Sequence, residues 1–200
     1  FINHIKQISW LQNIQIKTAF KEGVSFLKLV IKIKKEIVAY GLSKKDYDIT
    51  KMGRYLNYKQ FNKAIDEGAI VVDVRNYYES EVGRFENAIT PNVDCSKKLL
   101  PEIKKMLSNF KKDQILMYCT GGIRCEKASS YLIKSGFKNV NQLKGGIIKY
   151  AEDVKKNNAK TKFIGKNFVF DHRLGEKITD NIISKCHQCN KTADTHTNCV

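Results

Sequence analysis

The hydrophobic pattern changes its period repeatedly along residues 58–155. Short apolar runs bounded by charge are typical of buried strands, whereas apolar positions three and four residues apart are typical of helices. The pattern predicts strands at residues 69–75, 115–118 and 140–143 and helices at residues 59–67, 97–110, 123–134 and 147–154. Residues 77–89 are predicted to form a loop. Strands separated by helices indicate an α/β domain with a mostly parallel sheet flanked by helices on both faces.

Residues 1–40 show a different pattern. Apolar side chains in residues 1–14 are spaced as in an amphipathic helix with Trp10 in a core, and β-rich runs follow at residues 15–20, 26–33 and 36–40. This order predicts the C-terminal part of a small α+β domain. Because the chain starts at Phe1 rather than at Met, we expect it to be a segment of a longer protein. Residues 41–57 are polar and rich in turn-forming residues, and they are predicted to be a linker.

The C-terminal extension, residues 156–200, has a predicted strand at residues 163–171 and a short predicted helix at residues 180–184. It ends in a cluster of metal-binding residue types: Cys186, His187, Cys189, His196 and Cys199. Zinc is commonly bound by thiolates and imidazoles, often through a C-x2-C pair. The spacing indicates a zinc site of the three cysteines with His196 or with a cysteine beyond the end of this segment. The alternative is a set of free thiols.

The chain carries 36 basic and 20 acidic side chains, a formal net charge of +16 that is spread along its length. This excess favours a polyanionic partner such as RNA, although a compositional lysine bias on solvated surfaces explains it equally well. No apolar run reaches the roughly 18 residues of a membrane-spanning helix, and no secretory signal pattern occurs. Six cysteines, none before Cys95, do not resemble a disulfide framework, so a cytoplasmic protein with catalytic or metal-binding thiols is expected.

The most informative stretch begins where the strand predicted at residues 115–118 ends on Cys119. Gly121 and Gly122 follow, and a predicted helix starts near Ile123. Amide groups and the helix dipole at such a position attract anions and lower the pKa of a nearby thiol. We therefore predict that Cys119 is a nucleophilic thiolate. The alternative is a buried cysteine before an ordinary strand-to-helix turn.

Two other predicted strands, at residues 69–75 and 140–143, end in residues that we expect to lie near Cys119. Ligands of parallel sheets bind at the carboxyl ends of strands, and these ends carry Asp73 and Arg75 in one strand and Gly145 and Gly146 after another. We expect Asp73 and Arg75 to be scaffold residues that fix the loop through hydrogen bonds. The two glycines are expected to let the backbone approach the rim of the pocket.

Two further residues follow Cys119 in the loop and the first helical turn. Arg124 is expected mainly to close the loop by donating hydrogen bonds to backbone carbonyls. Cys125 is interpreted either as a thiol that resolves an oxidised Cys119 or as a small buried helix residue.

These motifs occur in the order found in rhodanese domains, which the chain resembles. The resemblance rests on four segments: Asp73-Val74-Arg75, Gly83-Arg84-Phe85-Glu86-Asn87-Ala88, Cys119 to Arg124, and Leu143 to Ile147. Rhodanese loops have four residues between the cysteine and the arginine, as here, where Thr120, Gly121, Gly122 and Ile123 intervene. The related phosphatases have five. The loop length therefore favours sulfur chemistry over phosphate hydrolysis.

The resemblance is closer to one branch, the rhodanese-type tRNA uridine hydroxylases. It extends over residues 24–199 and is carried by residues 117–129, 76–83 and 163–171 and by the cysteine motifs at 186–189 and 196–199. This resemblance implies a ferredoxin-like or acylphosphatase-like domain before the rhodanese domain. It also implies oxygen-dependent conversion of the tRNA wobble uridine to 5-hydroxyuridine, with tRNA as the partner and molecular oxygen as co-substrate.

The mechanism implied by the resemblance centres on Cys119, which in rhodaneses becomes a cysteine persulfide. No flavin, haem or facial-triad iron motif is evident in the sequence. We hypothesise that Cys119, as thiolate or persulfide, adds to C6 of uracil and activates C5 toward oxygen. Lysine-rich faces would contact the RNA. Tyr77 and Tyr78 are interpreted either as core residues or as exposed rings that would stack an unpaired base. The alternatives are a thiosulfate-type sulfurtransferase and a non-catalytic rhodanese-like binding module. The sequence indicates neither the oligomeric state nor the electron source.

Overall fold

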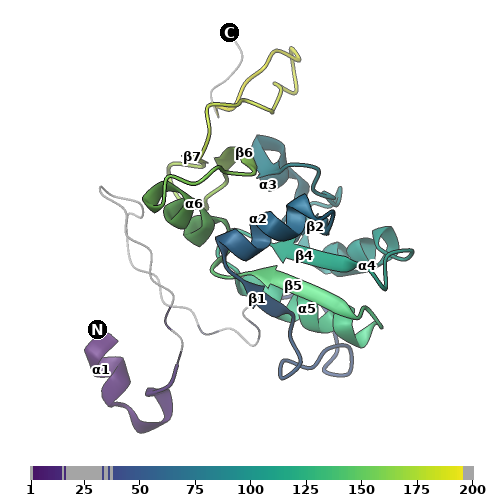
Figure 1. The fold of residues 1–200 in the computed structure, drawn as a ribbon, viewed down its shortest axis with the longest axis vertical. Coiled ribbons are helices and arrows are strands. Elements are labelled where there is room, and N and C mark those ends of the chain that lie inside the picture. Colours follow the sequence, from purple (N-terminus) through teal and green to yellow (C-terminus); the bar gives the residue numbers. More distant parts are fainter. Residues whose placement is uncertain (1, 15, 17–32, 34–35, 37, 196–200) are drawn as a thin grey trace.

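The structure is a computed structural model that describes residues 2–14, 16, 33, 36 and 38–195 (Figure 1). Its centre is a four-stranded parallel sheet in the order β1-β5-β4-β2. These strands are β1 (Arg54–Leu56), β2 (Ile70–Asp73), β4 (Gln114–Tyr118) and β5 (Asn139–Leu143). The predicted parallel sheet is confirmed, and β4, which leads to Cys119, lies between two other strands.

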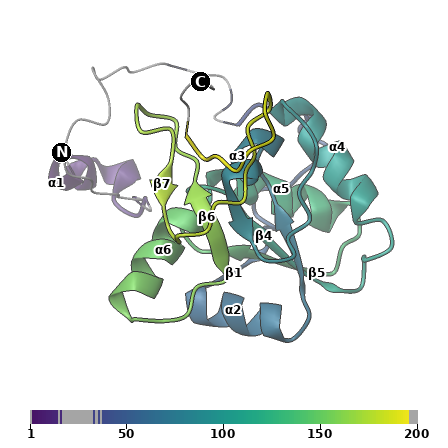
Figure 2. The same ribbon diagram turned by 90° about the horizontal axis from the view of Figure 1, so that it is seen from above.

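Helices cover both faces of this sheet (Figures 1 and 2). They are α2 (Tyr58–Asp66), α4 (Ser96–Met106), α5 (Ile123–Lys134) and α6 (Gly146–Lys156). Successive side chains of a strand point to opposite faces, so Ile115 and Met117 of β4 pack with α4 and α5, whereas Leu116 and Tyr118 pack with α2 and α6. These two clusters of buried side chains hold the central strand rigidly between two helical layers.

The segment at residues 77–89 was predicted as a loop, and this prediction is wrong. It contains the helix α3 (Tyr77–Val82) and the strand β3 (Gly83–Phe85). β3 pairs antiparallel with β6 (Phe163–Asn167), which pairs with β7 (Glu176–Lys177) in a small second sheet beside α6 (Figure 2). The partner of β3 is remote in sequence, and a three-residue strand has too little periodicity to be recognised alone.

The described N-terminal residues differ from the predicted helix and core. The helix α1 (Ile2–Gln7) buries none of its residues, a short 3-10 helix (Ser9–Leu11) follows, and Trp10 is 80% exposed. The helix predicted within residues 1–14 ends at Gln7, and the predicted core position of Trp10 is wrong. A short helix that buries no residue lacks the packing contacts that stabilise most helices in proteins. Most of residues 15–37, including most of the β-rich runs at residues 15–20 and 26–33, lies outside the described residues, and the ferredoxin-like domain remains a prediction. Of the run at residues 36–40, the described residues 36 and 38–40 form no strand, so this part of the prediction is wrong.

Residues 41–57, which were predicted as a linker, contact the domain closely. The Asp48 and Gly53 amides donate hydrogen bonds to the hydroxyls of Ser130 and Ser129, at 2.7 and 2.9 Å. The segment ends in β1, an edge strand of the parallel sheet.

The C-terminal extension is less regular than its pattern suggested. β6 ends at Asn167, four residues before the predicted strand end, and residues 180–184 form no helix. A five-residue helix without a buried face has little stability. Among the helices of the described residues, none is long and apolar enough to cross a membrane.

Candidate active site

Cys119 lies at the carboxyl end of β4, where only 1% of its surface is exposed. The Gly122 amide donates a hydrogen bond to its sulfur at 3.1 Å. Gly122 is the N-cap of α5 and has a φ of +81°, a left-handed conformation that favours glycine. The sequence therefore folds into a tight turn that directs a helix N-terminus at the thiol, as predicted.

A second glycine turn supports this loop from outside. The amides of Ile147 and Ile148, in the first turn of α6, donate hydrogen bonds to the carbonyls of Cys119 and Thr120 at 3.0 and 3.1 Å. Gly146 has a φ of +67°, and a Cβ at this position would lie 2.5 Å from the Cys119 carbonyl oxygen. This close approach requires glycine. At Gly145 an added Cβ would meet the Lys149 side chain at 2.5 Å.

Arg124 makes a different contact from the one predicted. Its guanidinium forms two hydrogen bonds of 2.6 and 2.7 Å to the carboxylate of Glu79 and a third of 3.2 Å to the Thr120 hydroxyl. The sequence analysis had proposed backbone carbonyls as its partners. The pair closes the loop by joining α5 to α3, and bidentate arginine–carboxylate contacts of this kind are strong and geometrically specific.

Glu79 is the functional residue that the sequence analysis missed. Its side chain is completely buried, and it was assigned to a loop. The sequence carries one local signal, since Asn76 and Glu79 have the spacing of a capping box. In the structure the Glu79 carboxylate accepts a hydrogen bond from the backbone amide of Asn76 at 3.2 Å. This signal marks the start of α3 but does not reveal the partner, which is 45 residues away.

The environment of Cys119 favours the thiolate. Burial alone raises the pKa of this thiol, but a hydrogen bond from the Cys125 thiol, the charge of Arg124 and the backbone amides of residues 124 and 125 together lower it to about 6. Burial, the hydrogen bond to Cys119 and the negative charge of its thiolate raise the pKa of Cys125 well above its usual value. Cys125 is therefore a buried, protonated donor that stabilises the anion beside it. Its predicted role in resolving an oxidised Cys119 stays a prediction.

Asp73 and Arg75 lie in the interior behind the site, and both side chains are fully buried. Arg75 donates hydrogen bonds of 2.8 and 2.6 Å to the Asp73 carboxylate and one of 2.6 Å to the Gly83 carbonyl. The Tyr118 hydroxyl donates to Asp73 at 2.7 Å. These contacts join the ends of β2 and β4 to the start of β3, which suits the scaffold function expected of the two residues.

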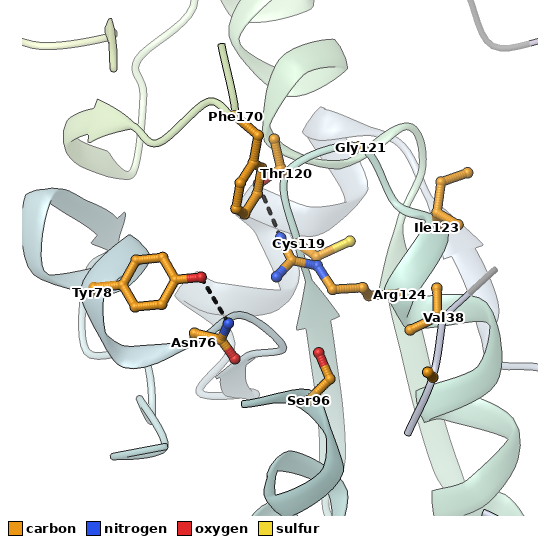
Figure 3. Close-up of a pocket in the computed structure, with 11 residues that line it drawn as sticks. Val38, Asn76, Tyr78, Ser96, Cys119, Thr120, Gly121, Ile123, Arg124 and Phe170 are labelled. Atoms are coloured by element: carbon orange, nitrogen blue, oxygen red, sulfur yellow. Dashed lines mark hydrogen bonds between the residues drawn. The ribbon is translucent and has the colours of Figure 1, made fainter. Parts of the chain in front are cut away.

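A cavity of about 400 Å³ opens directly above Cys119 (Figure 3). Its walls are formed by the Cys119 loop and by six residues from other segments: Val38, Ala39, Asn76, Tyr78, Ser96 and Phe170. The hollow places a buried thiol at the base of a space large enough for a flat ring, with α3 on one side and the segment after β6 on another.

Of the C-terminal cysteines, the two that the structure describes, Cys186 and Cys189, do not line this cavity. Cys186 and Cys189 lie in a hairpin in which the Cys186 amide donates to the Lys191 carbonyl at 2.8 Å, and Lys185 pairs with Thr192. Cys199 lies outside the described residues. Within the described part of the chain, no three metal-binding side chains come together. The zinc site stays a prediction.

Sequence comparisons identify two domain types along the chain. The model of the rhodanese-like domain matches residues 57–153, and the model described as rhodanase C-terminal matches residues 164–200. These segments contain β2, β4 and β5 of the parallel sheet, the Cys119 loop and most of the C-terminal extension.

Curated relatives match over nearly the whole chain. A protein of Leptospira interrogans named tRNA uridine(34) hydroxylase is 49% identical over 201 residues, which cover 100% of this chain and 55% of that protein. A protein of the same name from Photorhabdus laumondii is 46% identical over 191 residues, covering 94% of this chain and 54% of its own. The chain thus spans about half the length of the curated relatives it matches. Among solved structures, the BH2092 protein of Bacillus halodurans aligns over 65% of this chain and 86% of its own chain, with 23% sequence identity and a TM-score of 0.43. This structural similarity is too weak to add to the sequence matches.

Proposed function

We propose that this chain, which carries a rhodanese-like domain, belongs to the family of the proteins named tRNA uridine(34) hydroxylase, and that the protein hydroxylates the wobble uridine of tRNA at C5. The observation that carries the proposal is the buried Cys119 at the base of a cavity, with a pKa of about 6. At pH 7 roughly nine-tenths of such a group is ionised. The reaction therefore has a nucleophile ready without a separate general base.

In the first step, the Cys119 thiolate adds to C6 of the uracil ring. A carbon–sulfur bond forms, the C5–C6 double bond opens, and its electron pair is delocalised over C5 and the O4 carbonyl as an enolate. The reactant thiolate loses its negative charge to the base in this step. The amides and the Cys125 thiol that lower the pKa of Cys119 also make it a good leaving group in the last step.

In the second step, the carbanion-like C5 reacts with molecular oxygen and takes up a proton to give a C5 hydroperoxide. A thiol reductant then cleaves the O–O bond, which leaves a C5 hydroxyl and a sulfenic acid, and a second thiol converts the sulfenic acid to a disulfide and water. Loss of the C5 proton and expulsion of Cys119 restore the C5–C6 double bond. The overall reaction consumes uridine, O2 and two thiols and yields 5-hydroxyuridine, a disulfide and water.

The RNA partner fits the charge of the chain. With a formal net charge of +16, the protein attracts the phosphate backbone of a polyanion, which contributes affinity without sequence preference. Recognition of a wobble base then depends on the cavity, because anticodon-loop bases are unpaired and can leave the stack.

The proposal is tested by nucleoside mass spectrometry of tRNA from a deletion strain that expresses the full-length protein. We expect 5-hydroxyuridine with wild-type protein, none with Cys119→Ala, and a normal level with Cys95→Ala, which changes a half-buried cysteine outside the loop. Normal 5-hydroxyuridine with Cys119→Ala would overturn the proposal. So would thiosulfate sulfurtransferase activity in a protein that restores no 5-hydroxyuridine, which would favour the sulfurtransferase reading instead.

A further inference from the structure

Phe170 is a large apolar side chain that the fold leaves 61% exposed at the wall of the Cys119 cavity. Figure 3 shows it beside Thr120. Burying a phenylalanine side chain stabilises a fold by about 1.5–3 kcal/mol, and here that gain is largely absent. An exposed aromatic ring at the entrance to a reactive cavity is a candidate for contact with the substrate.

The backbone on either side of Phe170 is fixed. Val169 is buried, with 6% exposure, and Phe168 packs edge-to-face on Tyr78, so the two residues before Phe170 are anchored in the fold. On the other side, the Asp171 carboxylate accepts hydrogen bonds from the backbone amide and the Nε of Arg173 at 3.0 and 2.9 Å. Phe170 is therefore held in its exposed position by the fold.

Its ring is also supported laterally by other aromatic rings. Phe168 lies edge-to-face with Phe170 at a centroid distance of 5.1 Å and with Tyr78 at 5.4 Å. The Tyr78 hydroxyl accepts a hydrogen bond from the Asn76 side chain at 2.9 Å. Such contacts orient aromatic rings, so this aromatic row, defined as Tyr78, Phe168 and Phe170, presents one ring at the cavity in a set direction.

We propose that Phe170 is the stacking platform for the wobble uracil, which holds the base with C6 facing the Cys119 sulfur. This inference rests on the proposed function. Stacking on an aromatic side chain contributes about 1–3 kcal/mol per base and fits a flat ring that has left the anticodon stack. Tyr77 and Tyr78, the candidates for stacking named from the sequence, are both half-buried, whereas Phe170 is the exposed member of the row.

The test measures binding and turnover of an anticodon stem-loop by the full-length protein. Phe170→Ala should lower kcat/KM by about 5- to 150-fold, which corresponds to the stacking energy. Phe170→Leu, which keeps apolar bulk without a π face, should show most of this loss, and Phe170→Tyr should stay within about twofold of wild type. Phe110→Ala is the matched control, since Phe110 is also partly exposed, at 37%, but lies before β4 at the opposite end of the sheet from Cys119.

A second stem-loop without a base at the wobble position separates stacking from backbone binding. In a Cys119→Ser background, Phe170→Ala should weaken binding of the uridine stem-loop but leave binding of the abasic stem-loop unchanged. Equal loss for both ligands, or Phe170→Leu equal to wild type, would overturn the inference. This comparison of binding affinities needs no turnover, so it can be interpreted even if wild-type protein makes no 5-hydroxyuridine. The absence of 5-hydroxyuridine would count against the proposed function alone.

Discussion

Cys119 and the cysteines of the C-terminal hairpin lie in opposite environments. Cys119 is 1% exposed at the end of a central strand, with an amide, a second thiol and an arginine around its sulfur. Cys189 is exposed and Cys186 is half-buried, in a hairpin outside the parallel sheet. A single thiolate with a lowered pKa in a cavity suits nucleophilic chemistry, whereas two accessible thiols at C-x2-C spacing suit metal binding.

The difference shows that the scaffold, rather than the cysteine itself, determines the chemistry. The Cys119 environment depends on two buried arginine–carboxylate pairs. Asp73–Arg75 fixes the strand ends behind the site, and Glu79–Arg124 joins α3 to the loop. The hairpin is held by backbone contacts, by a hydrogen bond from the Ser184 hydroxyl to the Ala193 carbonyl and by an exposed contact between His187 and Glu81 of α3. Changes to these pairs should therefore affect Cys119 and leave the hairpin thiols unaffected.

The largest effect is expected from Arg75→Met. This change leaves the buried Asp73 carboxylate without its cation, and removing one partner of a buried ion pair typically costs about 3–5 kcal/mol. Urea unfolding should show a loss of that size, while the reaction rate of Cys189 with a thiol reagent in the native protein stays unchanged. Arg54→Met, at an exposed position in β1, should cost less than about 0.5 kcal/mol. A loss below about 1 kcal/mol for Arg75→Met would contradict the assigned scaffold function.

A smaller effect is expected from Arg124→Met, measured by the pH dependence of Cys119 alkylation. In wild-type protein the rate should rise with pH through the pKa of about 6 and level off above pH 7, because the thiolate is the reactive form. Loss of the neighbouring cation removes a contribution that lowers this pKa, so alkylation at pH 6 should slow by about 5- to 50-fold. An unchanged pH profile would show that the amides and Cys125 suffice without Arg124.

The parallel sheet and the Cys119 loop were predictable because their signals are local. The apolar run of β4, the glycine turn and the start of α5 follow one another directly in the sequence. Asp73 and Arg75 could also be predicted as scaffold residues, since Asp73 ends β2 and Arg75 follows two residues later.

Glu79 and Phe170 could not be placed in the same way, because their significance arises from tertiary contacts. Glu79 meets Arg124 across 45 residues, and α3 is too short for a clear period. Phe170 lies within a strand that was predicted to run to residue 171. Whether its side chain is buried or exposed depends on where that strand ends. The structure ends β6 at Asn167 and so leaves Phe170 at the cavity wall.

The smallest effect on Cys119 is expected from changes at the hairpin. If Cys186 and Cys189 are zinc ligands, the full-length protein should contain zinc in stoichiometric amount, and Cys186→Ser should reduce it. The alkylation pH profile of Cys119 should stay the same in this variant, since the contact between the hairpin and α3, from His187 Nε2 to Glu81 Oε2 at 3.4 Å, involves neither Cys119 nor its loop. Elemental analysis that finds no stoichiometric zinc in the full-length protein would reject the zinc prediction.

The most direct test of the central claim is covalent trapping with an anticodon stem-loop that carries 5-fluorouridine at the wobble position. Fluorine at C5 replaces the proton that must leave before Cys119 is expelled, so the adduct should persist. Intact-mass and peptide mass spectrometry of the full-length protein should then show one stem-loop attached at Cys119, with the same adduct in Cys125→Ser and none in Cys119→Ser. Absence of any adduct in wild-type protein, together with full hydroxylase activity in Cys119→Ser, would contradict the claim that this thiolate carries the reaction.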